Sequence, residues 1–286
     1  MKTREAMVAG LPDRAGDRHE LALARARLGA LLARRGDCTE ARGLLQQAIG
    51  DQQEALRSNP DDPAGRLRLW DQRQTLAGIL IRLGAHAAAA AVAEDLLREA
   101  PGDRRATTPA LVAILLTSCA AVVAHDEAMD PIARGASARS YARRAHDLLR
   151  DAARVGSGDP AAPYHLAWFL ATCPVAELRD PGEAVRIARG LVDRAPQVWI
   201  SWATLGAALY RSGDGTDARD VLERAADLNG GSLAFYGFFL AMAHHRLGHR
   251  DQARACFEQT ERWLRSMPWD EAAERLRDEA AGLLEK

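Results

Sequence analysis

The sequence is nearly without lysine: of its 286 residues, only Lys2 and Lys286 are lysines. Phosphate-binding loops, protein kinase active sites and Schiff-base enzymes all need an internal lysine, so these classes are excluded. Aromatic residues make up only 5%, and the apolar 48% consists mostly of alanine and leucine, which favour helix, rather than valine-isoleucine strand runs. The composition therefore predicts an all-α chain.

Charge of one sign is not in excess, since 38 basic residues face 39 acidic ones. This balance gives no field that favours nucleic acid or an anionic membrane, so neither is expected as a partner. The four cysteines, Cys38, Cys119, Cys173 and Cys256, lie far apart without a CxxC pair. Such spacing indicates buried thiols in a reducing cytoplasm rather than disulfides or a zinc site. We expect a cytoplasmic protein with no metal and no cofactor.

Two segments bear on targeting. Residues 1–19 are polar, are broken by Gly10, Pro12 and Gly16, and hold no apolar core of signal-peptide length, which predicts a flexible tail. The stretch from Ala106 to Ala124 carries no charged side chain and is about as long as a membrane span. Its threonines and alanines lower its hydrophobicity, so we expect a helix buried between neighbours instead.

A frame repeats four times along the chain. A leucine and a small residue are followed by a glycine seven residues after the small residue, and by an alanine five residues after that glycine. The copies begin at Leu28, Leu76, Leu205 and Leu240. Small residues on both helices let two antiparallel helices pack at backbone distance, with the glycine at the turn. The frame predicts stacked helical hairpins that form one continuous domain.

Extended to the whole chain, the pattern predicts about six hairpins and a C-terminal capping helix over residues 20–286. The approximate ranges are 20–56, 67–104, 108–155, 161–197, 199–231 and 233–267, with the cap at 269–284. The third unit lacks the glycine frame and is expected to have a loop from about His125 to Ser137. The fourth has an extended connection from Cys173 to Pro181.

The fifth unit carries the fullest form of the pattern. Its matching residues are Trp202, Leu205, Gly206, Leu209, Ala218, Leu222 and Ala225. With them the chain resembles the tetratricopeptide repeat family from about Glu20 to Met267. The stretch from Leu166 to Pro181 also resembles the repeat arms of some bacterial serine/threonine kinases. The family resemblance implies an α-solenoid whose first helices line a concave groove for a protein partner.

An arginine stands two residues before the turn glycine in every copy of the frame. These arginines are Arg34, Arg82, Arg211 and Arg246. Equivalent positions in stacked hairpins point the same way, so the four side chains are predicted to form a basic ladder for an acidic peptide. A cation near the end of a helix also complements the helix dipole. Both interpretations stay open at the level of sequence.

A second candidate lining is apolar and comes from the fifth and sixth units. We expect Tyr210, Phe235, Phe238 and Met242 to take part in binding an apolar anchor of the partner. Some rings at this helical spacing must pack in the core instead, and Phe239 is the one expected there.

No complete catalytic set stands in the sequence. His249, Arg250 and Asp251 read like a kinase catalytic loop, but Cys256 stands where that loop needs an asparagine. We therefore expect no enzyme but a scaffold that binds a protein or peptide. One alternative is a regulatory repeat arm of a bacterial serine/threonine kinase signalling system. Another is a small hydrolase in the third unit, which would need a nucleophile beside a base.

Overall fold

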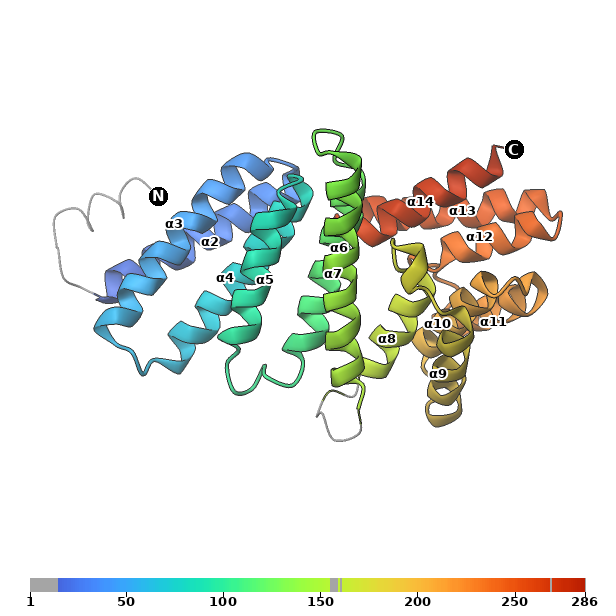
Figure 1. Cartoon of the computed structure of the whole chain (residues 1–286), viewed down its shortest axis with the longest axis horizontal. Helices are drawn as coiled ribbons and strands as arrows, with labels where there is room; N and C mark the ends of the chain where they lie inside the picture. Colours follow the sequence, from blue (N-terminus) through green and yellow to red (C-terminus); the bar gives the residue numbers. More distant parts are fainter. Residues whose placement is uncertain (1–14, 155–158, 160, 268, 286) are drawn as a thin grey trace. The chain divides into compact units, whose positions relative to one another are not determined.

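The structure is a computed structural model that describes residues 15–154, 159, 161–267 and 269–285 (Figure 1). Within these ranges the elements are α-helices and one short 3-10 helix, and no strand is present. Contacts divide the chain into two compact units with the boundary between Tyr141 and Ala142, where the sequence predicted one continuous domain.

The first unit consists of two helical hairpins and a further helix that packs on them. The hairpins are α2 (Ala15–Arg35) with α3 (Cys38–Ser58), and α4 (Pro63–Arg82) with α5 (His86–Arg98); α6 (Thr108–Ala124) packs on α5. Residues 15–19 are helical rather than part of a tail, and residues 1–14 of the predicted tail lie outside the described residues. Next, α7 (Pro131–Ala152) begins inside the predicted loop and crosses the unit boundary.

The second unit contains three hairpins and a last helix. The elements are α8 (Ala162–Thr172), η1 (Ala176–Leu178), α9 (Pro181–Arg194), α10 (Trp199–Arg211), α11 (Gly215–Leu228), α12 (Gly237–Arg246), α13 (Arg250–Ser266) and α14 (Glu271–Leu284). Each of the pairs α8/α9, α10/α11 and α12/α13 packs together (Figure 1). In chain order the described helices make five packed pairs, α6 and α7 stand at the position of the third predicted hairpin, and α14 comes last, so the prediction of an all-α solenoid of about six hairpins and a last helix is confirmed.

The turn glycines of the frame adopt the conformation that ends each first helix. Their φ angles are 100° at Gly36, 74° at Gly84, 95° at Gly213 and 81° at Gly248, in the left-handed region that glycine enters without strain. Each following N–H donates back to the helix it has just left, as from Asp214 to a carbonyl at 3.1 Å. This is the Schellman arrangement, which satisfies carbonyls that the helix itself leaves open.

The small residue of the frame lies where the two helices of a hairpin approach most closely. In the fifth hairpin a Cβ added to Gly206 would lie 2.4 Å from Cγ of Leu222. The frame alanines that face this position in the chain are also buried, with Ala41, Ala89 and Ala218 at 0% exposure. Close backbone packing within hairpins thus follows from the spacing in the sequence.

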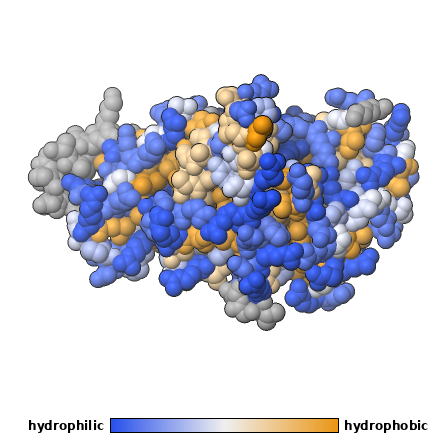
Figure 2. Space-filling view, in the orientation of Figure 1, coloured by the Kyte–Doolittle hydropathy of each residue, from blue (hydrophilic) through white to orange (hydrophobic). Residues whose placement is uncertain are grey.

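The outer surface of the molecule is mostly hydrophilic on the face drawn in Figure 2. A pale orange area lies over α5, whose alanines include the exposed Ala87, Ala88 and Ala91. The larger apolar side chains of the second unit are instead gathered inside it, around α10 and α12.

Candidate partner-binding site

Two of the four frame arginines join consecutive hairpins. In the first unit Nη1 of Arg82 donates to the carbonyl oxygen of Ala33 at 2.6 Å. In the second unit Nη1 of Arg246 donates to the carbonyl oxygen of Tyr210 at 3.1 Å. Each arginine lies two residues before its own turn glycine, and each acceptor lies three residues before the preceding turn glycine. The arginine therefore caps the C-terminal end of the neighbouring first helix, where carbonyls lack intrahelical donors.

The other frame arginine of the first unit, Arg34, is exposed on α2. Arg34 and Arg82 belong to the first unit, whereas Arg211 and Arg246 belong to the second. Two of the four predicted positions therefore lie in each unit.

Arg211 has a different partner from the other frame arginines. Its Nη1 and Nη2 donate to the two carboxylate oxygens of Glu279 on α14, at 2.5 and 2.6 Å. The guanidinium carbon lies 5.1 Å from the ring centroid of Phe239, and the side chain is only 12% exposed. A bidentate, charge-assisted contact backed by an aromatic ring is the geometry that arginine offers to a carboxylate.

We call the surface formed by Trp168 on α8, Tyr210 and Arg211 on α10, and Phe239 and Met242 on α12 the first-helix face. These side chains come from the first helix of each hairpin in the second unit. Tyr210 and Trp168 each meet Phe239 edge to face, at centroid distances of 5.7 and 5.9 Å. The guanidinium carbon of Arg246 lies 4.1 Å from the centroid of the Tyr210 ring. The face combines aromatic surface with positive charge.

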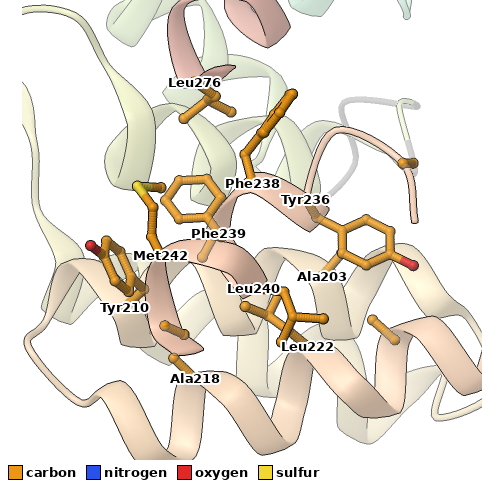
Figure 3. Packing of buried hydrophobic residues seen from close by; sticks show 14 of the residues in the cluster. Ala203, Tyr210, Ala218, Leu222, Tyr236, Phe238, Phe239, Leu240, Met242 and Leu276 are labelled. Carbon is orange, nitrogen blue, oxygen red and sulfur yellow. The ribbon is translucent and has the colours of Figure 1, made fainter. Parts of the chain in front are cut away.

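Helix α14 covers the first-helix face. Leu276 lies beside Phe238 and Phe239 (Figure 3), in a cluster that also includes buried alanines of α14. At the start of α14, the carboxylate of Asp270 lies close enough to Tyr164 on α8 to act with burial in raising the pKa of that phenol. Helix α14 thus packs on α12 and α13 of the last hairpin, as the predicted cap does, and also reaches α10 through Glu279.

Charged groups gather along the covered side of α14. Burial raises the pKa of Glu279, but the hydrogen bonds from Arg211 and the charges of Arg179 and Arg275 outweigh it, so the pKa is lowered. Burial also lowers the pKa of Arg179, as does the neighbouring Arg211. Burial raises the pKa of Glu271 to about 7, against the opposing effect of Arg275, with which it forms a 3.4 Å ion pair. Three arginines thus converge on one carboxylate.

The structure places the predicted apolar anchor residues mostly in the interior. Phe238, Met242 and Tyr210 are 0%, 1% and 4% exposed, so the expectation that they offer open surface needs correction. Packing from both sides explains it: Phe257 of α13 lies 5.6 Å from Phe238, centroid to centroid, and α14 covers the face. Phe235 alone of the four predicted residues stays partly exposed, 4.9 Å from the ring of Trp168.

Glu279 is the residue that the sequence interpretation missed. It stands on the same side of α14 as Glu271 and Arg275, because the three are spaced four residues apart. That spacing puts a charged row beside the apolar row of Ala273, Leu276 and Ala280 on one helix. The sequence shows this pattern, but nothing local to α14 indicates that its charged row would contact Arg211.

One cluster in the first unit joins a histidine to a tyrosine and an aspartate. Nδ1 of His86 lies 3.2 Å from the hydroxyl of Tyr141, and Nε2 lies 3.7 Å from Oδ2 of Asp126. The pKa of Tyr141 is raised by burial and by Cys119, which makes its oxygen a weaker nucleophile at neutral pH. The contact ties α7 to α5 rather than activating the phenol.

The histidines near the last frame glycine also approach each other. Nδ1 of His244 lies 3.4 Å from Nδ1 of His249, and Nε2 of His244 lies 3.6 Å from Oε1 of Glu223. Across the described ranges, no group of three or more His, Cys, Asp or Glu side chains is arranged to hold a metal ion.

A basic pocket of about 430 Å³ opens in the first unit, at the ends of the hairpins away from the glycine turns. Trp70 and Arg105 line it together with Arg66, Arg73 and Arg98. Glu99 also lines it and pairs with Arg73, which leaves a net positive lining. No motif in the sequence indicates this grouping, since the residues come from separate segments of the chain.

None of the described helices has both the length and the apolar character to cross a membrane. This includes α6, which covers most of the uncharged stretch that the sequence assigned to a buried helix. Ten of its residues, such as Val112 and Cys119, are buried in the first unit.

No protein family model matches the chain, and no curated protein matches it. Among solved structures, a thermophilic tetratricopeptide repeat protein of Thermus thermophilus is similar at 18% identity and a TM-score of 0.39, covering 93% of this chain and 100% of that one. A tetratricopeptide repeat protein of Parabacteroides merdae is similar at 15% identity and a TM-score of 0.42, with coverage of 93% and 100%. The assembly chaperone of RpL4 is similar at 18% identity and a TM-score of 0.43, with coverage of 93% and 96%. The repeated hairpins of this chain are seen in the equivalent contacts within the chain itself.

Proposed function

We propose that this chain is a non-catalytic scaffold that binds a segment of a partner protein on the first-helix face. The observation that carries the proposal is the arrangement around Arg211, whose guanidinium rests against Phe239 and grips a helix-borne carboxylate with both Nη atoms. A face that already holds a helix by one acidic and one apolar contact is suited to hold a helix of the same kind from another protein.

The predicted residues take separate parts in this proposal. Arg211 pairs with an acidic group of the partner, and Phe235, beside Trp168, offers the partly exposed ring for an apolar anchor. Arg246 stacks on Tyr210 and holds it in place. Phe238 and Met242 form the floor beneath α14.

In the first unit, Arg34 and Arg82 are proposed to serve a second acidic stretch of the same partner. Both lie at the glycine-turn ends of their first helices, and both are exposed. Because Arg82 already donates to a backbone carbonyl, its contribution is that of a positive charge rather than a bidentate contact.

Two of the cysteine thiols are poor nucleophiles, which supports a role in binding rather than in catalysis. Burial raises the pKa of the thiols of Cys173 and Cys256 to about 11, so both are protonated at neutral pH and react poorly. We place the chain in the cytoplasm, where four widely separated thiols stay reduced. A regulatory arm of a kinase signalling system would use the same face, and the identity of the captured partner separates the two functions.

Affinity capture with a matched pair of charge reversals tests the proposal. Arg211→Glu reverses the charge on the first-helix face, whereas Arg189→Glu makes the same change at an exposed position on the second helix α9. Captured proteins are identified by mass spectrometry, and their contact sites are mapped by cross-linking. We expect Arg211→Glu to lose a partner that wild type and Arg189→Glu retain, with both variants equally helical by circular dichroism. Equal capture by all three proteins would show that the face does not bind the partner.

A further inference from the structure

We propose that α14 is an internal ligand of the first-helix face, and that the partner displaces it with an acidic amphipathic helix carrying a Leu-x-x-Glu motif. This inference rests on the proposed function, because it names the class of segment that binds and the device that controls access.

The acidic and apolar side chains of α14 match the arginine and the aromatic rings of the first-helix face. Leu276 lies beside Phe238 and Phe239 (Figure 3). Glu279, three residues later, accepts hydrogen bonds from both Nη atoms of Arg211. Positions three apart share one side of a helix. A partner helix with leucine and glutamate at that spacing reproduces both contacts at once.

Beside its apolar part, the contact between α14 and the face includes buried polar atoms that are incompletely satisfied. Nε of Arg211 and Oε2 of Glu271 are buried and have no hydrogen-bond partner among the described residues, and Nε of Arg275 has only the 3.4 Å ion pair with Glu271 on its own helix. Buried polar atoms without partners weaken an interface, since each has given up its contact with water. The interface between α10 and α11 differs, because it is built from close contacts such as that of Gly206 with Leu222.

Helix α14 carries its own helix-forming contacts. Its N-cap, Asp270, accepts a hydrogen bond from the backbone N–H of Ala273 at 3.0 Å. Arg277 pairs with Glu274 on the preceding turn, and with Asp278. These local pairs favour the helix independently of the face. Helix α14 follows the last hairpin and belongs to none, so its departure from α12 and α13 breaks no contact within a hairpin.

The positive charge around Glu279 favours an acidic helix at this place. Arg179, Arg211 and Arg275 surround Glu279, and of these only Arg275 leaves together with α14. An undocked α14 therefore exposes two neighbouring arginines, one directly after η1 and one at the end of α10, beside an aromatic surface. Acidic groups on an incoming helix are favoured over neutral or basic ones at such a place.

The experiment uses the full chain and a fluorescein-labelled synthetic peptide with the sequence of residues 269–285. Binding is measured by fluorescence anisotropy to wild type, Glu279→Gln and the control Asp278→Asn. The control removes a carboxylate one residue away, on a side chain that is 68% exposed. Hydrogen exchange by mass spectrometry reports on α14 in the same proteins.

We expect the peptide to bind Glu279→Gln roughly tenfold to a hundredfold more tightly than wild type, because a charged hydrogen bond that holds α14 in place is lost. Asp278→Asn should resemble wild type, and Glu279→Gln combined with Arg211→Gln should lose the gain. Faster exchange in α14 of Glu279→Gln, with α10 to α13 unchanged, supports the same conclusion. Peptide affinities equal within about twofold for all three proteins overturn the proposal, whatever the exchange data show.

The two proposals fail in different ways. If the peptide result is negative while capture still depends on Arg211, the face binds a partner and α14 is a fixed part of the fold. If the peptide result is positive while capture is indifferent to Arg211, α14 exchanges but the scaffold function is wrong.

Discussion

Replacing Gly206 with alanine tests the close approach on which the hairpin architecture depends. The added Cβ would lie 2.4 Å from Cγ and 2.6 Å from Cδ2 of Leu222. Leu222 is fully buried on α11, and the backbone oxygen of Ala218 lies 3.4 Å away on the other side. At these distances the side chain of Leu222 or the helix that carries it must shift to admit the added methyl group.

The size of the effect follows from two opposing contributions. Carbon atoms prefer separations of about 3.5–4.0 Å, so Leu222 must shift by about 1 Å or the helices must separate. Overpacking of this kind costs about 1–3 kcal/mol. Alanine is better than glycine in a helix by about 1 kcal/mol. We expect Gly206→Ala to lower the free energy of unfolding by up to about 2 kcal/mol.

Gly190→Ala is the matched control because Gly190 lies in α9 of the same unit and a Cβ there would meet nothing within 4 Å. It should raise stability by about 0.5–1 kcal/mol. Urea unfolding followed by tryptophan fluorescence measures both, since Trp199 and Trp202 lie on α10 itself. The two variants are thus predicted to change the free energy of unfolding in opposite directions. If Gly206→Ala proved as stable as Gly190→Ala, the close approach of α10 and α11 would be refuted.

Three further changes test the turn, the frame arginine and the buried acid. Gly213→Ala forces alanine into a left-handed turn at φ 95° and should cost about 1–2 kcal/mol in urea unfolding. Arg246→Lys keeps the charge but loses the geometry of the bond to Tyr210, so we expect a loss of about 1 kcal/mol; unchanged stability would favour the helix dipole as the whole effect. Because the pKa of Glu271 is raised to about 7, its protonated form stabilises docked α14 at low pH, and this stability is lost as pH rises from the usual carboxylate range through 7. Glu271→Gln should remove that part of the decline in urea midpoint between about pH 5 and 8, and parallel pH profiles of variant and wild type would contradict the assignment.

The hairpins could be predicted because their determinants are local in the sequence. The spacing of Leu205, Gly206, Gly213 and Ala218 specifies a helix, a tight contact, a left-handed turn and a second helix within a short segment. The same spacing recurs in the other copies of the frame, so their hairpins could be predicted without knowledge of long-range contacts.

The candidate site was only partly predictable, because its decisive contact joins residues far apart in the chain. The frame singled out Arg211 as a candidate, but not Glu279, which lies 68 positions later. Phe238 and Met242 are buried in a cluster that includes Leu276 of α14, and no local pattern encodes the contacts of α14 with α10, α12 and α13. Spacing along a helix predicts which side chains share a side but not what that side meets.

The break in the repeat explains why Arg211 differs from the arginines that follow an intact hairpin. Arg82 and Arg246 each donate to a carbonyl at the end of the preceding first helix, which also accepts the backbone N–H of the turn glycine. Before Arg211 the chain has α8 and the irregular connection to α9, and there Nε of Arg179 already donates to the carbonyl of Cys173 at 2.6 Å. The end of α8 is thus capped from within its own hairpin, and Arg211 is left to bind a carboxylate instead. The frame arginine that meets a carboxylate thus stands where the repeat departs from its pattern, whereas Arg82 and Arg246 join consecutive hairpins.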